Sequence, residues 1–315
     1  MVLGLAAGLL IAAVNRQGIY DYVALHGYRA PDVVSSIANE DSMTPRARKI
    51  FYVNHPLIVN KAGFGNDCTS GSSKERTIVL GCYHGNQAGI FVLEVNDARL
   101  TGVEQVTAAH EMLHAAYDRL SSREKTHINA LLLDYYHNQL KDDRIKTTID
   151  AYKQSEPDDV VNEMHSIFGT EIANLPAPLE AYYKQYFTDR SRVAAYADRY
   201  QEEFSSRTAA VKQYDSQLAA LKIQIDNMNA DLKQRYAAIT SEQSQLASLR
   251  SNGNISEYNA GVPDFNRQVD AYNTEVNTVQ GLVDQYNMIV ASRNAIALEQ
   301  QELANALSSS ATKIK

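Results

Sequence analysis

The last third of the chain carries apolar residues at alternating spacings of three and four, and this regularity restricts the fold more than any other feature. Such spacing keeps side chains on one stripe of a helix and is typical of coiled coils. The stripe is interrupted at 251–256 and again at 261–263, where Gly, Pro and Asn gather. Two stripes joined by a short breaker predict an antiparallel helical hairpin over residues 205–315. The first stripe contains Val211, Tyr214, Leu218, Leu221, Ile225, Met228, Leu232, Ile239, Leu246 and Leu249, and the second contains Phe265, Val269, Tyr272, Val276, Val279, Val283, Tyr286, Val290, Ala297 and Leu307.

A second pattern, His110-Glu111-x-x-His114, lies in a run of alanines and other apolar residues that favour a buried helix. Histidines four positions apart lie on one helical face, so both imidazoles can reach one metal ion. Glu111 can lean over the same ion as a general base for a bound water. This is the arrangement of zinc-dependent proteases, and it predicts one catalytic Zn²⁺. The alternative is a chance match or an inactive relative.

A catalytic zinc needs a third protein ligand and an open position. In one group of zinc peptidases a glycine follows the second histidine by three residues and the third ligand, a histidine, follows it by six. This chain has Tyr117 and Leu120 at those positions, so that group is excluded. A glutamate from a later helix is the remaining common solution. Glu163, on a helix predicted over Asp158–Ile167, fits this role. Glu171 and His165 remain rival ligands.

Together, His110–His114 and the Asn-Glu-x-x-Ser pattern of Asn162–Ser166 resemble the gluzincin zinc peptidases, the thermolysin-like group. The resemblance covers these two motifs and the order of elements, not the whole chain. It implies a zincin-like catalytic domain with Glu111 as base and proton shuttle. It also implies His110, His114 and Glu163 as the metal ligands.

One position departs from that family. The thermolysin-like motif continues with Asp, where this chain has Ile167, so the carboxylate that orients a ligand histidine must come from elsewhere. Glu171 is a candidate for that role. The family also stabilises the oxyanion with a downstream His or Tyr, for which no clear match exists. Tyr183, Tyr186 and Arg190 occupy the corresponding part of the chain, although a Tyr-rich helix is more often packing.

Residues 17–204 are predicted to form this catalytic domain, with a small sheet followed by helices. Phe51–Val53, Thr77–Leu80 and Gly89–Val95 have the β-branched and aromatic composition of strands, and the last two are expected to pair as a hairpin. Ile90–Val95 would accept an extended peptide substrate as a further strand. Helices are expected over Ser122–Leu140 and from Pro176 toward Phe204. The predicted fold class is therefore α+β followed by a helical hairpin.

The first 16 residues are predicted to be a signal or membrane-anchor segment. Residues 1–14 carry no charge, but as a helix they would span about 21 Å, less than the roughly 30 Å hydrocarbon core. A start codon assigned too late would explain the shortness, and a buried N-terminal helix is the alternative. The chain has two cysteines, Cys68 and Cys82, which are expected to form a disulfide that indicates an oxidising compartment. The alternative is two reduced thiols in a cytosolic protein.

A net charge of −7 argues against nucleic acid as a partner. The sequence predicts an extracytoplasmic zinc peptidase, secreted or attached to a membrane through its N-terminal segment, that hydrolyses peptides or proteins. Its hairpin would be a spacer or bind a protein partner. The alternative is a non-enzymatic envelope scaffold, in which the hairpin binds a partner and the zincin-like domain is inactive.

Overall fold

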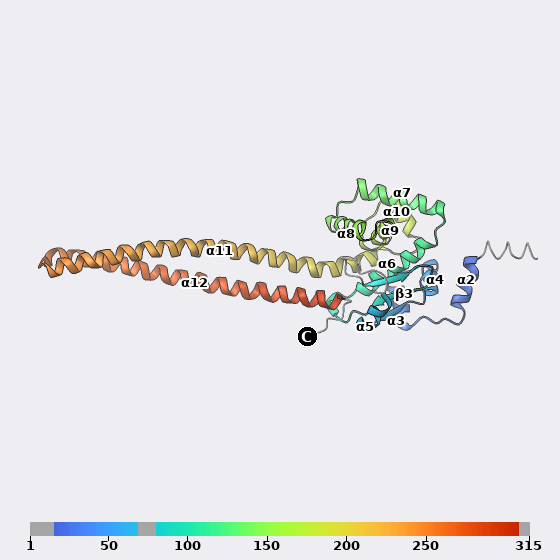
Figure 1. Cartoon of the computed structure of the whole chain (residues 1–315), viewed down its shortest axis with the longest axis horizontal. Coiled ribbons are helices and arrows are strands. Elements are labelled where there is room, and N and C mark those ends of the chain that lie inside the picture. The colour runs from blue at the N-terminus through green and yellow to red at the C-terminus, as the bar shows by residue number, and fades with distance from the viewer. Residues whose placement is uncertain (1–15, 69–79, 309–315) are drawn as a thin grey trace, which may run out of the picture. The chain divides into compact units, whose positions relative to one another are not determined.

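The computed structural model describes residues 16–68 and 80–308. The chain divides into two compact units, one comprising residues 1–203 and 303–315 and the other residues 204–302. Figure 1 shows the elements along the chain. They are α2 (Arg16–Leu25), α3 (Asp32–Glu40), α4 (Pro45–Val53), β1 (Leu57–Val59), α5 (Lys61–Cys68), β2 (Gly81–His84), β3 (Gly89–Leu93), a short 3₁₀ helix (Ala98–Leu100), α6 (Val103–Asp118), α7 (Ser122–Asn138), α8 (Asp143–Ser155), α9 (Val160–Glu171), α10 (Ala177–Tyr183), α11 (Ser191–Ser251) and α12 (Ile255–Leu307).

In the described residues the first unit has a three-stranded sheet of order β1-β3-β2. β2 and β3 form an antiparallel hairpin, with Cys82 opposite Phe91, but its first strand begins at Gly81, after the strand predicted over Thr77–Leu80. β1 runs parallel to β3, with Leu57 also opposite Phe91. The prediction that Ile90–Val95 accepts a substrate strand is wrong, because β3 is hydrogen-bonded on both sides. Of the strand predicted over Thr77–Leu80, residues 77–79 lie outside the described residues.

The strand predicted at Phe51–Val53 is wrong, because these residues form the last turn of α4. Thr44 caps this helix: its hydroxyl oxygen accepts a hydrogen bond from Ala47 N–H at 3.2 Å, and Pro45 follows at the first helical position. The helix started by this cap continues through the β-branched and aromatic residues. Burial of Phe51 against the core outweighs their preference for strands.

The core of the first unit surrounds α6, which packs against α9 on one side and against β2 and β3 on another. Small residues make this close packing possible, since Ala108, Ala109, Ala115 and Ala116 are all buried. Gly169 of α9 is equally important, because a Cβ there would lie 2.4 Å from Leu113 Cδ1. The contact between α6 and α9 therefore depends on the absence of a side chain at position 169.

A single helix from Pro176 to Phe204 is not formed, because the chain breaks between α10 and α11. In the break, Thr44 N–H donates to Tyr186 O at 2.9 Å and Thr188 N–H donates to Ser42 O at 2.8 Å. These two bonds connect the break to the segment before α4. The long-range pairing replaces the local helical bonds that the sequence predicted.

Helices α11 and α12 form the predicted hairpin and run side by side (Figure 1). Asp215 pairs with Arg293 at 2.9 Å, and Arg235 pairs with Glu275 at 2.8 Å. From Asp215 to Arg235 the numbers rise along α11, whereas their partners in α12 fall from Arg293 to Glu275. The two helices are therefore antiparallel. All residues of the predicted stripes are buried or half-buried except Val276, which is 38% exposed.

The turn of the hairpin lies where the first interruption was predicted. Gly253 adopts a positive φ of 81°, which glycine tolerates without a steric penalty. The second predicted interruption is wrong, because Pro263 lies inside α12. Leu246 of α11 packs against the neighbouring Gly261, where a Cβ would approach it to 2.8 Å.

The predicted disulfide is present and joins Cys68, at the end of α5, to Cys82 in β2. It connects a helix to the strand that faces α6. Among the described helices, none is long and apolar enough to cross a membrane.

Replacing both cysteines with serine should lower the free energy of unfolding. The bridge spans a sequence separation of 14, and closing a loop of about 15 residues is worth about 3 kcal/mol in the chain-entropy model. Urea denaturation of oxidised wild type and the double variant measures the difference. Equal unfolding free energies, or two free thiols on alkylation of denatured oxidised protein, would contradict the structural role of the bridge.

Candidate metal centre

His110, His114 and Glu163 come together at the contact between α6 and α9. His110 Nε2 and His114 Nε2 lie 3.0 Å apart. The Glu163 carboxylate faces both, with Oε1 3.4 Å from His114 Nε2 and Oε2 3.6 Å from His110 Nε2. The three ligand atoms lie within 4.8 Å of one another and can hold a metal ion. Two imidazole nitrogens and one carboxylate oxygen match the donors of catalytic zinc sites.

Burial and neighbouring charges shift the pKa values of His110 and Glu163. Burial disfavours the charged form of His110, but the facing Glu163 carboxylate and the nearby charge of Glu111 raise its pKa to about 9. Burial also raises the pKa of Glu163, yet His114, His110 and a hydrogen bond from Tyr152 outweigh it and lower that pKa. Glu163 Oε2 is buried without a hydrogen-bond partner. A buried acceptor facing two imidazole nitrogens is a suitable ligand for a cation.

Glu111 lies beside the group, between α6 and β2. A Cβ at Gly81 would lie 2.7 Å from Glu111 Oε1 and 2.5 Å from Thr107 Cγ2, so the strand approaches the helix closely only because residue 81 is glycine. Burial raises the pKa of the Glu111 carboxyl, while the charges of His110 and His114 and a hydrogen bond from Tyr83 N–H oppose the increase. A buried carboxylate with a raised pKa is well suited to accept a proton.

Two contributors to the site were not predicted from the sequence. Tyr152 of α8 hydrogen-bonds the Glu163 carboxylate, and Gly81 makes room for Glu111. Neither belongs to a motif, and Tyr152 is one of 19 tyrosines. The only local signal was a lone glycine before a short strand, which can mark close backbone approach.

Neither rival ligand lies in the metal-ligating group. His165 is fully buried, its Nε2 lies 2.9 Å from the Tyr182 hydroxyl, and burial lowers its pKa to about 3. Glu171 accepts a hydrogen bond from Arg144 Nη1 at 2.6 Å. Both side chains thus make these contacts away from the metal-ligating group. The charge of Glu171 helps to raise the pKa of His110, but among the described residues no hydrogen bond joins Glu171 to a ligand histidine.

The three candidate oxyanion stabilisers have structural contacts. Tyr183 donates from its hydroxyl to His165 O at 2.7 Å, and Tyr186 is buried against Tyr182. Arg190 donates to Ala173 O at 3.0 Å and pairs with Glu180. Their roles in catalysis remain predictions, and these contacts account for their burial.

A second group of carboxylates shares Glu163. Its other members, Glu156 and Asp159, lie at the turn between α8 and α9. Asp159 is the residue before the first turn of α9, a position where carboxylates are common because of the helix dipole. An all-oxygen set suits calcium or magnesium, whereas the histidine-containing set suits zinc.

Glu163→Ala should remove most of the bound metal, because it deletes one of three ligands. Glu171→Ala is the matched control: it removes a carboxylate from the same helix that pairs with Arg144, so it should keep stoichiometric metal. Elemental analysis of dialysed protein measures both. Equal metal content in wild type and Glu163→Ala would reassign the third ligand.

Tyr152→Phe should weaken metal affinity by at least ~10-fold, since hydrogen bonds to ligands typically change affinity by about 10- to 100-fold. Tyr136→Phe is the control, because Tyr136 donates to Asp150 at the surface, at 3.1 Å. Competition against a chromogenic chelator gives both affinities. An unchanged affinity for Tyr152→Phe would mean that its hydrogen bond does not position Glu163.

Comparison of the chain with protein-family models, with curated protein sequences and with solved structures gives no match.

Proposed function

We propose that the protein is a zinc-dependent peptidase. The observation that carries the proposal is the group of half-buried His110 with buried His114 and Glu163, and with buried Glu111 directly beside it. Buried carboxylates and imidazoles are costly for a fold unless something pairs with them. A site that served packing alone has no need of two histidines facing one carboxylate, with a second carboxylate adjacent to them.

The residues present suit zinc. His110, His114 and Glu163 would hold the ion and leave a coordination position open. A zinc ion held there would lower the pKa of a bound water toward about 7 and would polarise a scissile carbonyl. Glu111 would accept the proton of the attacking water and deliver it to the leaving amine. Its burial favours this role, because a carboxyl with a raised pKa accepts a proton more readily than an exposed one.

We infer that the substrate is an extended peptide. Among the described strands, β2 lies at an edge of the sheet and packs against α6. Backbone groups on a free edge pair with an extended chain. A peptide added along β2 would lie beside the strand whose Tyr83 N–H contacts Glu111. This assigns to β2 the role that the sequence had suggested for Ile90–Val95.

We further propose that the protein works outside the cytoplasm, as a secreted or membrane-attached enzyme. The disulfide supports this, because such bridges persist in oxidising compartments. The hairpin of α11 and α12 carries none of the proposed ligands or the base. Its role would be to space the catalytic unit or to bind a protein partner.

Glu111→Gln should reduce the turnover number by roughly 10²- to 10⁴-fold while zinc content stays the same, because an amide cannot accept the water's proton. Glu104→Gln on the same helix is the matched control. Glu104 Oε1 accepts a hydrogen bond from Val95 N–H at 2.8 Å, and an amide oxygen can still do so. Cleavage of a peptide library, read by mass spectrometry, identifies a substrate for both measurements.

Wild-type turnover by Glu111→Gln would show that Glu111 is not the base. Stoichiometric zinc without cleavage of any library peptide by wild type would instead favour the non-enzymatic scaffold. Cleavage that persists in protein lacking zinc would contradict a metal-dependent mechanism.

A further inference from the structure

Helix α2 buries a carboxylate and exposes apolar side chains, which is the reverse of an ordinary surface helix. Asp21 is 3% exposed, whereas Ile19, Tyr22 and Val23 are 48%, 71% and 67% exposed. Residues at spacings of three and four share a face, so Ile19, Tyr22 and Val23 form one apolar surface. A surface helix in water ordinarily buries that face and exposes its carboxylate. We call these three residues the outer face of α2.

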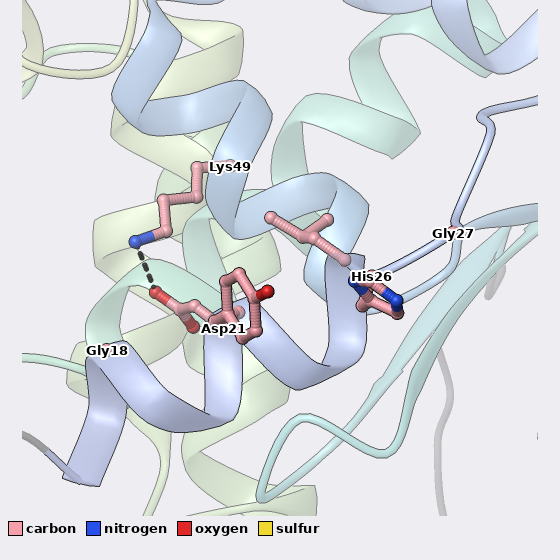
Figure 2. A pocket seen from close by; sticks show the side chains of 7 residues that line it. Gly18, Asp21, His26, Gly27 and Lys49 are labelled. Atoms are coloured by element: carbon pink, nitrogen blue, oxygen red, sulfur yellow. Dashed lines mark ion pairs between the residues drawn. The ribbon is translucent and has the colours of Figure 1, made fainter.

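The inward face is fixed by charge. Asp21 Oδ2 lies 2.8 Å from Lys49 Nζ of α4, as Figure 2 shows, and Asp21 Oδ1 accepts from Arg119 Nη2 at 3.0 Å. Gln17 Nε2 donates to the same Asp21 oxygen at 2.8 Å. Rolling α2 to bury its outer face would break these contacts and leave two cations without their carboxylate. The outer face is therefore held outward by the ion pairs beneath it.

The surroundings of the outer face indicate what covers it. In residues 16–30 the charged side chains are Arg16, Asp21 and Arg29; the two arginines are exposed and the single carboxylate is buried. Exposed charge here is thus positive. A cavity of about 500 Å³ that borders Tyr22 is also lined by Lys49, whose side chain is half exposed. Apolar residues beside tyrosine and basic groups match the boundary between lipid acyl chains and anionic headgroups.

The sequence before α2 points the same way. Residues 1–14, which lie just before α2 in the sequence, carry no charged side chain. An apolar environment that accommodates such a sequence would be close along the chain to the outer face. A lipid bilayer is one partner that would suit both the uncharged sequence of residues 1–14 and the outer face of α2.

We propose that α2 lies in the plane of a membrane interface, with Ile19, Tyr22 and Val23 directed at the acyl chains and the arginines at the headgroups. The inference stands apart from the peptidase activity, because it depends on α2 and its contacts alone. Arg119 directly follows α6, the helix that carries His110 and His114. The ion pair with Asp21 would thereby fix the metal helix to the membrane-bound helix.

The chain contains no tryptophan, so Tyr22→Trp creates a single fluorescent reporter on the outer face. The matched control is Leu133→Trp on α7, at a position 37% exposed in the same unit. Each full-length variant is mixed with vesicles of phosphatidylcholine and phosphatidylglycerol, with or without brominated acyl chains. The emission of Tyr22→Trp should move to shorter wavelength on vesicle addition and be quenched by the brominated lipid. The emission of Leu133→Trp should do neither.

Four results would overturn the proposal. The first is failure of the full chain to float with the vesicles, and the second is solvent-like emission from Tyr22→Trp in protein that does float. Equal shift and quenching in both variants would show that the contact is not specific to α2. A blue shift without vesicles that grows with protein concentration would assign the outer face to a second copy of the chain. Loss of catalytic activity alone would not produce any of these results.

Discussion

The contact between α6 and α9 is the constraint on which the candidate site depends, because it alone brings Glu163 to the two histidines. The helices approach closely where Gly169 meets Leu113, a contact that even a methyl group would obstruct. Buried alanines line the same region of α6. The resulting proximity places one carboxylate against two imidazoles, an arrangement whose desolvation cost a bound cation would offset.

The sheet completes this arrangement from the other side of α6. Gly81 lets β2 approach the helix, and the Tyr83 N–H reaches Glu111. The disulfide from Cys82 ties the same strand to α5. The proposed base is consequently held by backbone and covalent structure, which limits the side-chain movements open to it. Pre-organisation of this kind is what a site needs when one group accepts and then returns a proton.

Features that follow from local periodicity could be predicted from the sequence. The two stripes of the hairpin and the shared face of His110 and His114 depend on helical spacing, which a linear pattern records. Features that depend on distant segments could not. Phe51–Val53 has strand composition but completes a capped helix, and the segment around Tyr186 is held by residues near Thr44. Glu163 could be predicted as a ligand because the two histidines already implied a third one. Nothing in the sequence distinguished Tyr152 from the other tyrosines.

X-ray absorption spectroscopy at the zinc edge of the purified, zinc-loaded protein tests the central claim most directly. The account predicts a first shell of nitrogen and oxygen at about 2.0–2.1 Å, with the scattering signature of two imidazoles. The Glu163→Ala variant should either lose the zinc spectrum or show that the carboxylate oxygen of the first shell has been replaced. A shell without imidazole scattering, or a six-oxygen shell of the kind expected from the Glu156, Asp159 and Glu163 group, would contradict the assignment of His110, His114 and Glu163 as the zinc ligands.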